Sequence, residues 1–194
     1  METTAAKMYE VIMQLISTHL NGLSLIQLKI FSDSRGFFVE RFRAQELANL
    51  GIKTQFIQDN HSHSKPNVLR GLHLQLNPGQ AKLVGVIRGK IWDVAVDVRP
   101  GSSTLGQYFT VELSDENGKL LYVPPGFAHG FCVLGDQAAD VLYKVDSYYQ
   151  PSNEVGLMWN DPDLKIPWPN PSPIVSDRDQ MGLLFKDYLK QHCK

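Results

Sequence analysis

The chain has 194 residues, a formal net charge of -1 and 43% hydrophobic residues. This length is typical of one compact domain with a sizeable core. A net charge near zero gives no general attraction to nucleic acid or to an anionic membrane, so an anionic ligand needs locally placed basic residues. The two cysteines, Cys132 and Cys193, make no disulfide framework, which indicates a reducing cytoplasm.

We expect residues 1–22 to be a leader and residues 23–194 to form a single domain. Residues 8–16 are the only apolar stretch near the start, but Glu10 and Gln14 interrupt it and no small-residue cleavage site follows. A signal peptide is therefore not expected, and the stretch is too short to cross a bilayer. It predicts a short helix or a flexible segment.

The middle of the chain is a series of short strand-like runs separated by turns. Alternating apolar residues predict strands over residues 23–30, 37–42 and 56–60, and residues 44–50 predict a helix closed by Gly51. Further strands are predicted over residues 68–75, 82–88, 91–98, 108–113, 120–123, 127–134 and 141–149. Many short strands with regular turns are typical of an antiparallel sandwich or barrel. Residues 161–173 predict a proline-rich loop, and residues 181–191 a terminal helix.

The run over residues 68–75 carries two chemically active side chains, Arg70 and His73, with Gly71 between them. In an unbroken strand these two side chains point to opposite faces. A glycine allows a bulge that changes this. A satisfied core histidine beside a surface arginine fits these eight residues equally well.

Two other strands place polar groups among apolar ones. His129 shares a strand face with Phe127 and Phe131, which is an inward position if that face lines a barrel. Lys82 shares a face with valines, although a surface lysine at a strand end is the alternative.

The sequence gives little indication of a metal-binding site or of a catalytic nucleophile. His61 and His63 lie in a polar segment with no carboxylate at a spacing that completes a facial triad, so we expect no metal site. Cys132 is expected to be a packing residue, and no serine lies in a nucleophile elbow. The remaining candidate residues are acid–base groups and arginines, which suit proton transfer on a phosphorylated substrate. The acid–base groups are His73, Lys82, His129, Tyr143, Asp177 and Asp179, and the arginines are Arg35 and Arg70.

Ordered motifs over residues 23–187 add a specific resemblance. They include Asp-Ser-Arg-Gly-Phe-Phe-Val-Glu at 33–40, Phe-Ile-Gln-Asp-Asn at 56–60, Val-Leu-Arg-Gly-Leu-His-Leu-Gln at 68–75, Gln-Ala-Lys-Leu-Val at 80–84, Asp-Val-Ala-Val-Asp at 93–97, Pro-Gly-Phe-Ala-His-Gly-Phe at 125–131, Leu-Tyr-Lys at 142–144, Trp-Asn-Asp-Pro at 159–162 and Ser-Asp-Arg-Asp at 176–179. In these motifs the chain resembles the dTDP-4-dehydrorhamnose 3,5-epimerase family.

The resemblance implies a mainly β fold, an antiparallel jelly-roll barrel of the cupin type with a few short peripheral helices. It implies an isomerase that needs no cofactor, acts on a dTDP-4-keto-6-deoxyhexose and forms a homodimer. Residues 23–30 are our candidate for exchange between the subunits, because pairing between subunits covers open sheet edges.

The resemblance also implies roles for individual residues. The catalytic base falls on His73, the acid on Tyr143, the carboxylate that orients the base on Asp179, and the lysine near the substrate carbonyl on Lys82. Tyr149 falls on the position that stacks on the thymine ring. The other nucleotide and diphosphate contacts fall on Arg35, Glu40, Gln58, Asn60, Arg70, His129 and Glu154, with Arg178 also at the substrate site.

Three positions depart from the family pattern. Leu74 replaces an aromatic residue, Gly85 stands where a basic residue is frequent, and Arg178 replaces a lysine. Leu74 and Gly85 are expected to reshape the sugar pocket, which leaves open whether C3, C5 or both are inverted. Three further functions compete with epimerisation: a ketoisomerase, a non-catalytic nucleotide-sugar binding module and a metal-dependent cupin oxygenase.

Overall fold

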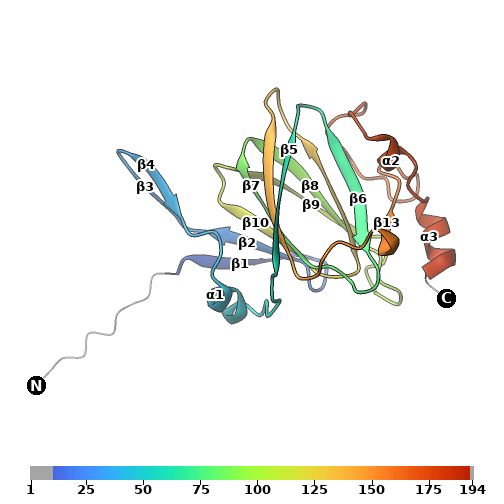
Figure 1. Ribbon diagram of the computed structural model, residues 1–194, viewed down its shortest axis with the longest axis horizontal. Helices are drawn as coiled ribbons and strands as arrows, with labels where there is room; N and C mark the ends of the chain where they lie inside the picture. Colours follow the sequence, from blue (N-terminus) through green and yellow to red (C-terminus); the bar gives the residue numbers. More distant parts are fainter. Residues whose placement is uncertain (1–10, 193–194) are drawn as a thin grey trace, which may run out of the picture.

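The computed structural model describes residues 11–192, which form two antiparallel sheets that face each other and a separate hairpin (Figure 1). The six-stranded sheet contains, in order, β1 (Met13–Ser17), β2 (Ser24–Leu28), β10 (Lys119–Val123), β7 (Lys82–Arg88), β12 (Ala139–Val145) and β5 (Gln58–Ser64). The five-stranded sheet contains β13 (Glu154–Gly156), β6 (Leu69–Gln75), β11 (Phe127–Val133), β8 (Lys90–Asp97) and β9 (Tyr108–Ser114). The hairpin pairs β3 (Ile30–Asp33) with β4 (Gly36–Val39) and projects away from the sheets.

The predicted antiparallel architecture is confirmed, and so are most of the predicted strands. The helices are short and peripheral: α1 (Ala44–Asn49), α2 (Asp177–Gln180), α3 (Phe185–His192) and the single 3₁₀ turn η1 (Pro151–Asn153). Helix α1 matches the prediction, and α3 begins four residues later than predicted. Strand β13 and helix α2 were not predicted, because three and four residues are too few to show a period.

The N-terminal prediction is wrong where the structure describes it. Met13–Ser17 form strand β1 rather than a helix or a flexible segment, and β1 pairs with β2 in antiparallel register from Met13–Leu28 to Ser17–Ser24. Strand β2 has β1 on one side and β10 on the other within this chain, and the exchange of residues 23–30 between subunits stays a prediction. The first ten residues of the predicted leader lie outside the described residues, and the boundary at residue 23 stays a prediction.

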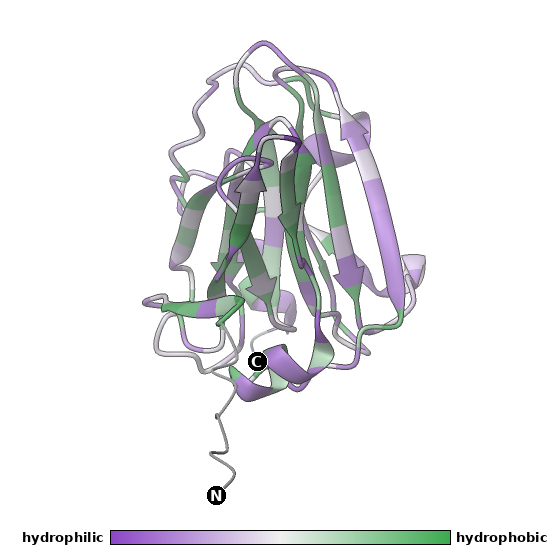
Figure 2. Ribbon diagram, turned by 90° about the vertical axis from the view of Figure 1, so that its left-hand side faces the viewer, coloured by the Kyte–Doolittle hydropathy of each residue, from purple (hydrophilic) through white to green (hydrophobic). Residues whose placement is uncertain are grey.

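Three apolar layers hold the sheets in place, and the hydrophobic strands gather in the middle of the molecule (Figure 2). The central layer lies between the sheets and contains residues such as Val84 and Val141 of one sheet and Phe131 of the other. A second layer lies on the outer face of the five-stranded sheet, where α3 and the loop before it cover Leu72, Leu74, Val94 and Val96. The third lies under α1, on the outer face of the six-stranded sheet. Both sheets are therefore covered, and each inward-facing polar residue needs its own partner.

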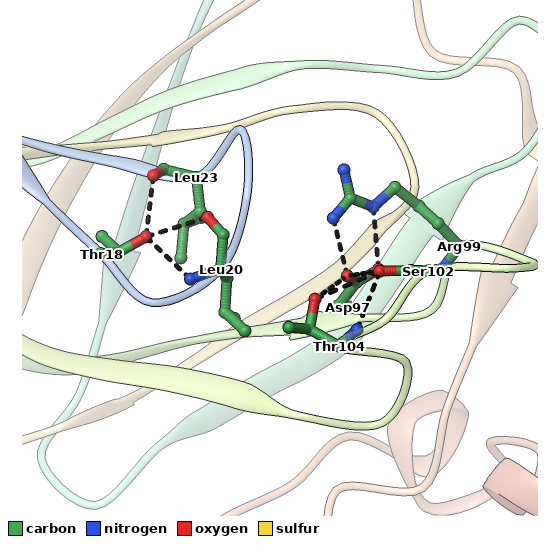
Figure 3. Close-up of polar contacts among 7 residues, drawn as sticks. All are labelled: Thr18, Leu20, Leu23, Asp97, Arg99, Ser102 and Thr104. Carbon is green, nitrogen blue, oxygen red and sulfur yellow. Dashed lines mark hydrogen bonds and ion pairs between the residues drawn. The ribbon is translucent and has the colours of Figure 1, made fainter.

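The end of β8 is held by a buried carboxylate. Asp97 is fully buried and accepts hydrogen bonds from Ser102 Oγ (2.6 Å), Thr104 Oγ1 (2.6 Å) and Arg99 Nη2 (2.7 Å) (Figure 3). Although burial raises the pKa of Asp97, these hydrogen bonds outweigh it and hold the pKa well below its ordinary value. Figure 3 also shows Thr18, whose hydroxyl donates to the carbonyl of Leu23 and closes the β1–β2 turn. Within residues 11–192, no helix is long and apolar enough to cross a membrane.

Candidate active site

A pocket opens between the two sheets and contains most of the predicted site residues. It is lined by Ser62, Arg70, His73, Lys82, His129, Gly130, Phe131, Val141, Tyr143, Glu154 and Arg178. Strands β5, β7 and β12 form one wall, and β6, β11 and β13 form the other. Groups from opposite sheets therefore meet one ligand from opposite sides.

A bulge in β6 turns both Arg70 and His73 toward this pocket. In the pairing of β6 with β11, Arg70 lies opposite Phe131 and His73 lies opposite His129, so two residues of β6 face Gly130 alone. Gly71 has φ +109°, and a Cβ atom there would lie 2.6 Å from the His129 carbonyl oxygen and 2.7 Å from Gly130 Cα. Only glycine fits, and the bulge that a glycine allows is present at this position.

His73 is held by a buried carboxylate. Its Nε2 atom lies 2.6 Å from Asp179 Oδ1, and the Gly71 backbone N–H donates to the other oxygen at 3.2 Å. Asp179 is fixed in turn because Ser176 caps α2 and accepts a hydrogen bond from the Asp179 backbone N–H. Burial raises the pKa of Asp179, but the hydrogen bond from His73 and the neighbouring donors bring it below its ordinary value. An ionised carboxylate fixes the imidazole tautomer and leaves Nδ1 as the ring nitrogen that is free to accept a proton.

Lys82 stands beside this pair. Its Nζ atom donates to the His73 carbonyl oxygen at 3.4 Å. Burial lowers the pKa of this ammonium to about 8, against the opposing charges of Glu154 and Asp93. At neutral pH the pocket therefore holds a poorly hydrated cation, which favours negative charge that develops on a ligand.

Tyr143 comes from the opposite wall. Burial raises the pKa of its phenol, so the hydroxyl is protonated at neutral pH and can donate. Asn60 lies directly opposite Tyr143 in the pairing of β12 with β5, and its side chain interacts with the phenol. Gln58 donates to Asn60 Oδ1 at 2.7 Å, so these two predicted residues support Tyr143 from β5.

Three predicted residues form one polar cluster, and two of them, Glu154 and Arg178, line the pocket. Tyr149 donates its hydroxyl proton to Glu154 Oε2 at 2.7 Å, and Arg178 forms an ion pair with the same oxygen. Arg178 Nη1 also lies 3.5 Å from the Tyr149 hydroxyl. Burial raises the pKa of Glu154, but the hydrogen bonds from Tyr149 and Arg178 outweigh this effect and bring the pKa below its ordinary value. Glu154 is therefore ionised at neutral pH.

His129 and Arg70 have partners of their own. His129 Nε2 lies 3.0 Å from both oxygens of Asp93, which is fully buried on β8. Arg70 donates from Nε to Ser64 Oγ at 2.8 Å and from Nη2 to the His63 carbonyl oxygen at 3.2 Å. Arg70 and His129 thus both line the pocket on its five-stranded wall, and the Arg70 guanidinium is in reach of an anionic ligand.

Two predicted contacts, Arg35 and Glu40, do not join this pocket. Arg35 lies at the tip of the β3–β4 hairpin and pairs with Asp33 at 2.6 Å, with 87% of its side chain exposed. Glu40 pairs with Arg43 at 2.5 Å at the base of the same hairpin. Asp177, a weaker candidate, is exposed on α2 and does not line the pocket.

The expectation that Leu74 and Gly85 reshape the sugar pocket is wrong. Leu74 points away from the pocket into the apolar layer that α3 covers. Gly85 faces the outer side of β7, where a Cβ atom would lie 2.4 Å from Arg41 Nη2 and 2.3 Å from Leu120 Cδ2. Of the three departures, Arg178 alone lines the pocket.

The histidine pair on β5 has a different environment. His61 Nε2 and His63 Nδ1 each lie 2.9 Å from the same oxygen of Asp140 on the neighbouring strand. Within the described part of the chain, no group of three or more His, Cys, Asp and Glu residues is placed to hold a metal ion. Cys132 is buried and free, as expected for a packing residue.

Sequence analysis missed Asp93 and Ser62. A signal existed for Asp93: an acid inside a strand of otherwise apolar residues needs a buried partner. Ser62 had none, because serine is common on polar edge strands and β5 shows no apolar period.

Comparisons with known proteins bear directly on this geometry. The family model described as dTDP-4-dehydrorhamnose 3,5-epimerase matches residues 17–187. The chain belongs to this family. It is 45% identical over 177 residues to a dTDP-4-dehydrorhamnose 3,5-epimerase of Shigella flexneri, covering 90% of this chain and 97% of that one.

A solved structure of the family has the same fold. It is a dTDP-6-deoxy-D-glucose-3,5-epimerase from Legionella pneumophila in complex with dTDP-4-keto-L-rhamnose, with a TM-score of 0.86 and 45% identity, covering 90% of this chain and 93% of that one. A more distant relative, a dTDP-4-dehydrorhamnose 3-epimerase of Streptomyces niveus, is 37% identical over 80% of this chain and 76% of its own length. The predicted family, cupin-type fold and isomerase class are confirmed.

Proposed function

We propose that the chain is a cofactor-independent 3,5-epimerase of a dTDP-4-keto-6-deoxyhexose. One observation carries the proposal: His73, backed by buried Asp179, and Tyr143 line the same pocket from opposite sheets. Inversion of a carbon centre requires that a proton leave one face and that another arrive on the opposite face. A base and an acid on opposite walls meet that requirement.

The substrate supplies its own electron sink. The protons at C3 and C5 are α to the C4 ketone, so loss of either one gives an enolate. His73 removes the proton as general base, and the Asp179 carboxylate stabilises the imidazolium that forms. The C–H electron pair moves into the enolate, and its oxygen is stabilised by the Lys82 ammonium. Tyr143 then delivers its phenolic proton to the other face of the carbon, which inverts the centre and restores the ketone.

The rest of the pocket is proposed to bind the nucleotide. Arg70 offers donors for the diphosphate, and so does His129 when its second ring nitrogen carries a proton; the charge-assisted hydrogen bonds of a guanidinium suit phosphate oxygens. Tyr149 is half exposed at the pocket mouth, where its ring is available to stack on thymine while Glu154 and Arg178 hold its hydroxyl.

We further propose a homodimer in which Arg35 and Glu40 complete the pocket of the other subunit. The β3–β4 hairpin projects from the domain (Figure 1), and Phe37 and Phe38 on it are 62% and 65% exposed. Two exposed phenylalanines beside an arginine favour burial against another surface. Light scattering at micromolar concentration should give a dimer, and a monomer would contradict this assignment.

Mixed subunits test the shared pocket directly. An Arg35→Ala chain has an intact base but a defective hairpin, and a His73→Asn chain has the reverse. If the hairpin acts on the partner, mixing the two inactive variants should restore activity in one pocket of each mixed dimer. If each hairpin serves its own pocket, no mixture regains activity.

The alternative is inversion of a single centre, and the 3-epimerase relative from Streptomyces niveus is the observation that keeps it open. Proton NMR of turnover of dTDP-4-keto-6-deoxyglucose in deuterated water separates the two. Epimerisation at both centres removes the C3 and C5 proton signals of the product, whereas a single-centre enzyme removes one. Absence of exchange at both carbons would contradict the proposed function. We also propose that the protein works in the cytoplasm, where the free thiol of Cys132 stays reduced.

A further inference from the structure

Ser62 is a pocket residue that the proposed mechanism leaves without a role. Its Oγ atom is buried and has no hydrogen-bond partner among residues 11–192. Ser62 also lines the pocket. A buried hydroxyl without a partner is uncommon, because its desolvation is not compensated. At the wall of a binding pocket, the missing partner is most simply a group of the ligand.

The neighbours of Ser62 show where along the ligand that group lies. The less exposed face of β5 presents Gln58, Asn60, Ser62 and Ser64 in alternation, about 7 Å apart from one to the next. Asn60 lies opposite Tyr143 and interacts with its phenol, and Ser64 accepts a hydrogen bond from Arg70. Ser62 thus stands between the residue that contacts the acid and the residue that holds the arginine.

The order of these contacts matches the order of groups in a nucleotide sugar. This step rests on the proposed function, in which Tyr143 acts at the reacting carbons and Arg70 binds the diphosphate. In a hexose 1-diphosphate, the carbon between the anomeric centre and the reacting C3 is C2. We propose that Ser62 Oγ hydrogen-bonds the hydroxyl group at C2 of the sugar and so selects 2-hydroxy over 2-deoxy substrates.

This contact positions the sugar and takes no part in proton transfer. A serine hydroxyl both donates and accepts, so it pairs with a sugar hydroxyl in either direction. When the sugar has no C2 hydroxyl, Ser62 makes no hydrogen bond to the sugar. Its removal therefore affects 2-hydroxy sugars alone.

Binding of two unreactive ligands tests the proposal apart from catalysis. The ligands are dTDP-6-deoxyglucose and dTDP-2,6-dideoxyglucose, which lack the 4-ketone, and calorimetry gives their affinities together with that of dTDP. In Ser62→Ala the affinity for the 2-hydroxy sugar should fall by about 3- to 10-fold, the range for one neutral hydrogen bond. Affinities for the 2-deoxy sugar and for dTDP should stay unchanged.

Two further variants separate selectivity from a structural effect. Ser62→Cys keeps the size of the side chain with a weaker donor and should show the same selective loss. The matched control is Ser64→Ala, which removes the neighbouring hydroxyl that holds Arg70 and should weaken all three ligands alike. An equal loss for both sugars in Ser62→Ala, a loss of dTDP affinity, or no loss at all would overturn the proposal. Turnover of dTDP-4-keto-6-deoxyglucose by the wild-type protein, measured alongside, tests the proposed function independently of these binding differences.

Discussion

Replacement of Tyr143 by phenylalanine should separate proton removal from proton return. The change deletes only the phenolic oxygen, so the ring still fills its place in the pocket wall beside Val141. His73 and its bond to Asp179 lie on the opposite sheet and stay intact. Lys82, the proposed stabiliser of the enolate, also stays in place.

The expected loss in the rate of inversion is the contribution of one general acid, because the proposed base remains in Tyr143→Phe. A positioned general acid contributes roughly 10²- to 10⁴-fold, which is about 2.7 to 5.4 kcal/mol of the barrier to inversion at 1.36 kcal/mol per decade. Exchange on the original face should survive, because protonated His73 can return a solvent-derived proton to the side from which it took one. His73→Asn, by contrast, should stop both exchange and inversion.

The assay compares deuterium incorporation in recovered substrate with the rate of product formation, both in deuterated water. In Tyr143→Phe, incorporation should persist while product formation falls. The control is His73→Asn, in which both signals should be lost. Inversion by Tyr143→Phe at the wild-type rate would refute Tyr143 as the acid, and His129 on the facing sheet would be the next residue to test.

Three further changes probe other parts of the molecule. The Lys82 ammonium has a pKa of about 8, and the proposed mechanism needs it as a cation, so kcat/KM should fall as pH rises through about 8. Lys82→Met should lower the rate and remove this alkaline fall of kcat/KM. An alkaline fall that is unchanged in Lys82→Met would exclude Lys82 as its source. Arg70→Ala should weaken dTDP binding by about 1.5–3 kcal/mol, as expected for one charged hydrogen-bonding group, and unchanged affinity by calorimetry would place the diphosphate elsewhere. Asp97 has a pKa below its ordinary value, so its stabilising effect is present at neutral pH and lost as pH falls below that ordinary value. Asp97→Asn should therefore lower the free energy of unfolding by about 1.5–3 kcal/mol at pH 7 and by less in acid, as measured by urea denaturation; an equal loss at both pH values would contradict the sign.

The parts of the fold that sequence analysis predicted well are those with a clear period. Strands β7, β8 and β11 alternate or run apolar between glycine and proline turns, and their predicted bounds agree with the structure to within one residue. Strand β5 was predicted too short. Both of its faces are polar, so the sequence shows no apolar period there, and the strand is held in the sheet by its pairing with β12. Strand β1 was missed for a related reason: four of its five residues are exposed, so it is an edge strand with little apolar pattern.

The candidate site was predicted mainly through family motifs, and the structure adds the partners of its residues. Asp179 is far from His73 in sequence, and their contact depends on a four-residue helix that no period reveals. That Arg35 and Glu40 lie outside the pocket of their own chain was not predictable from one sequence, because a motif assigns a role to a residue without placing that residue in space. Ser62 has no pattern at all, and only a structure shows that its hydroxyl lacks a partner.

Gly71 explains why Arg70 and His73, three residues apart on one strand, line the same pocket. Without the bulge, β6 would direct either Arg70 or His73 into the outer apolar layer, where a charge without a partner is costly. The bulge is possible because Gly71 and Gly130 let β6 and β11 approach where a Cβ on either residue would clash: at Gly130 it would lie 2.6 Å from the Arg70 carbonyl oxygen. The Gly71 N–H freed from the regular ladder then donates to Asp179, so the same distortion that turns His73 inward also anchors the carboxylate that holds it. The glycine between the arginine and the histidine is therefore part of the geometry that brings the proposed base into the pocket, although it carries no reactive group.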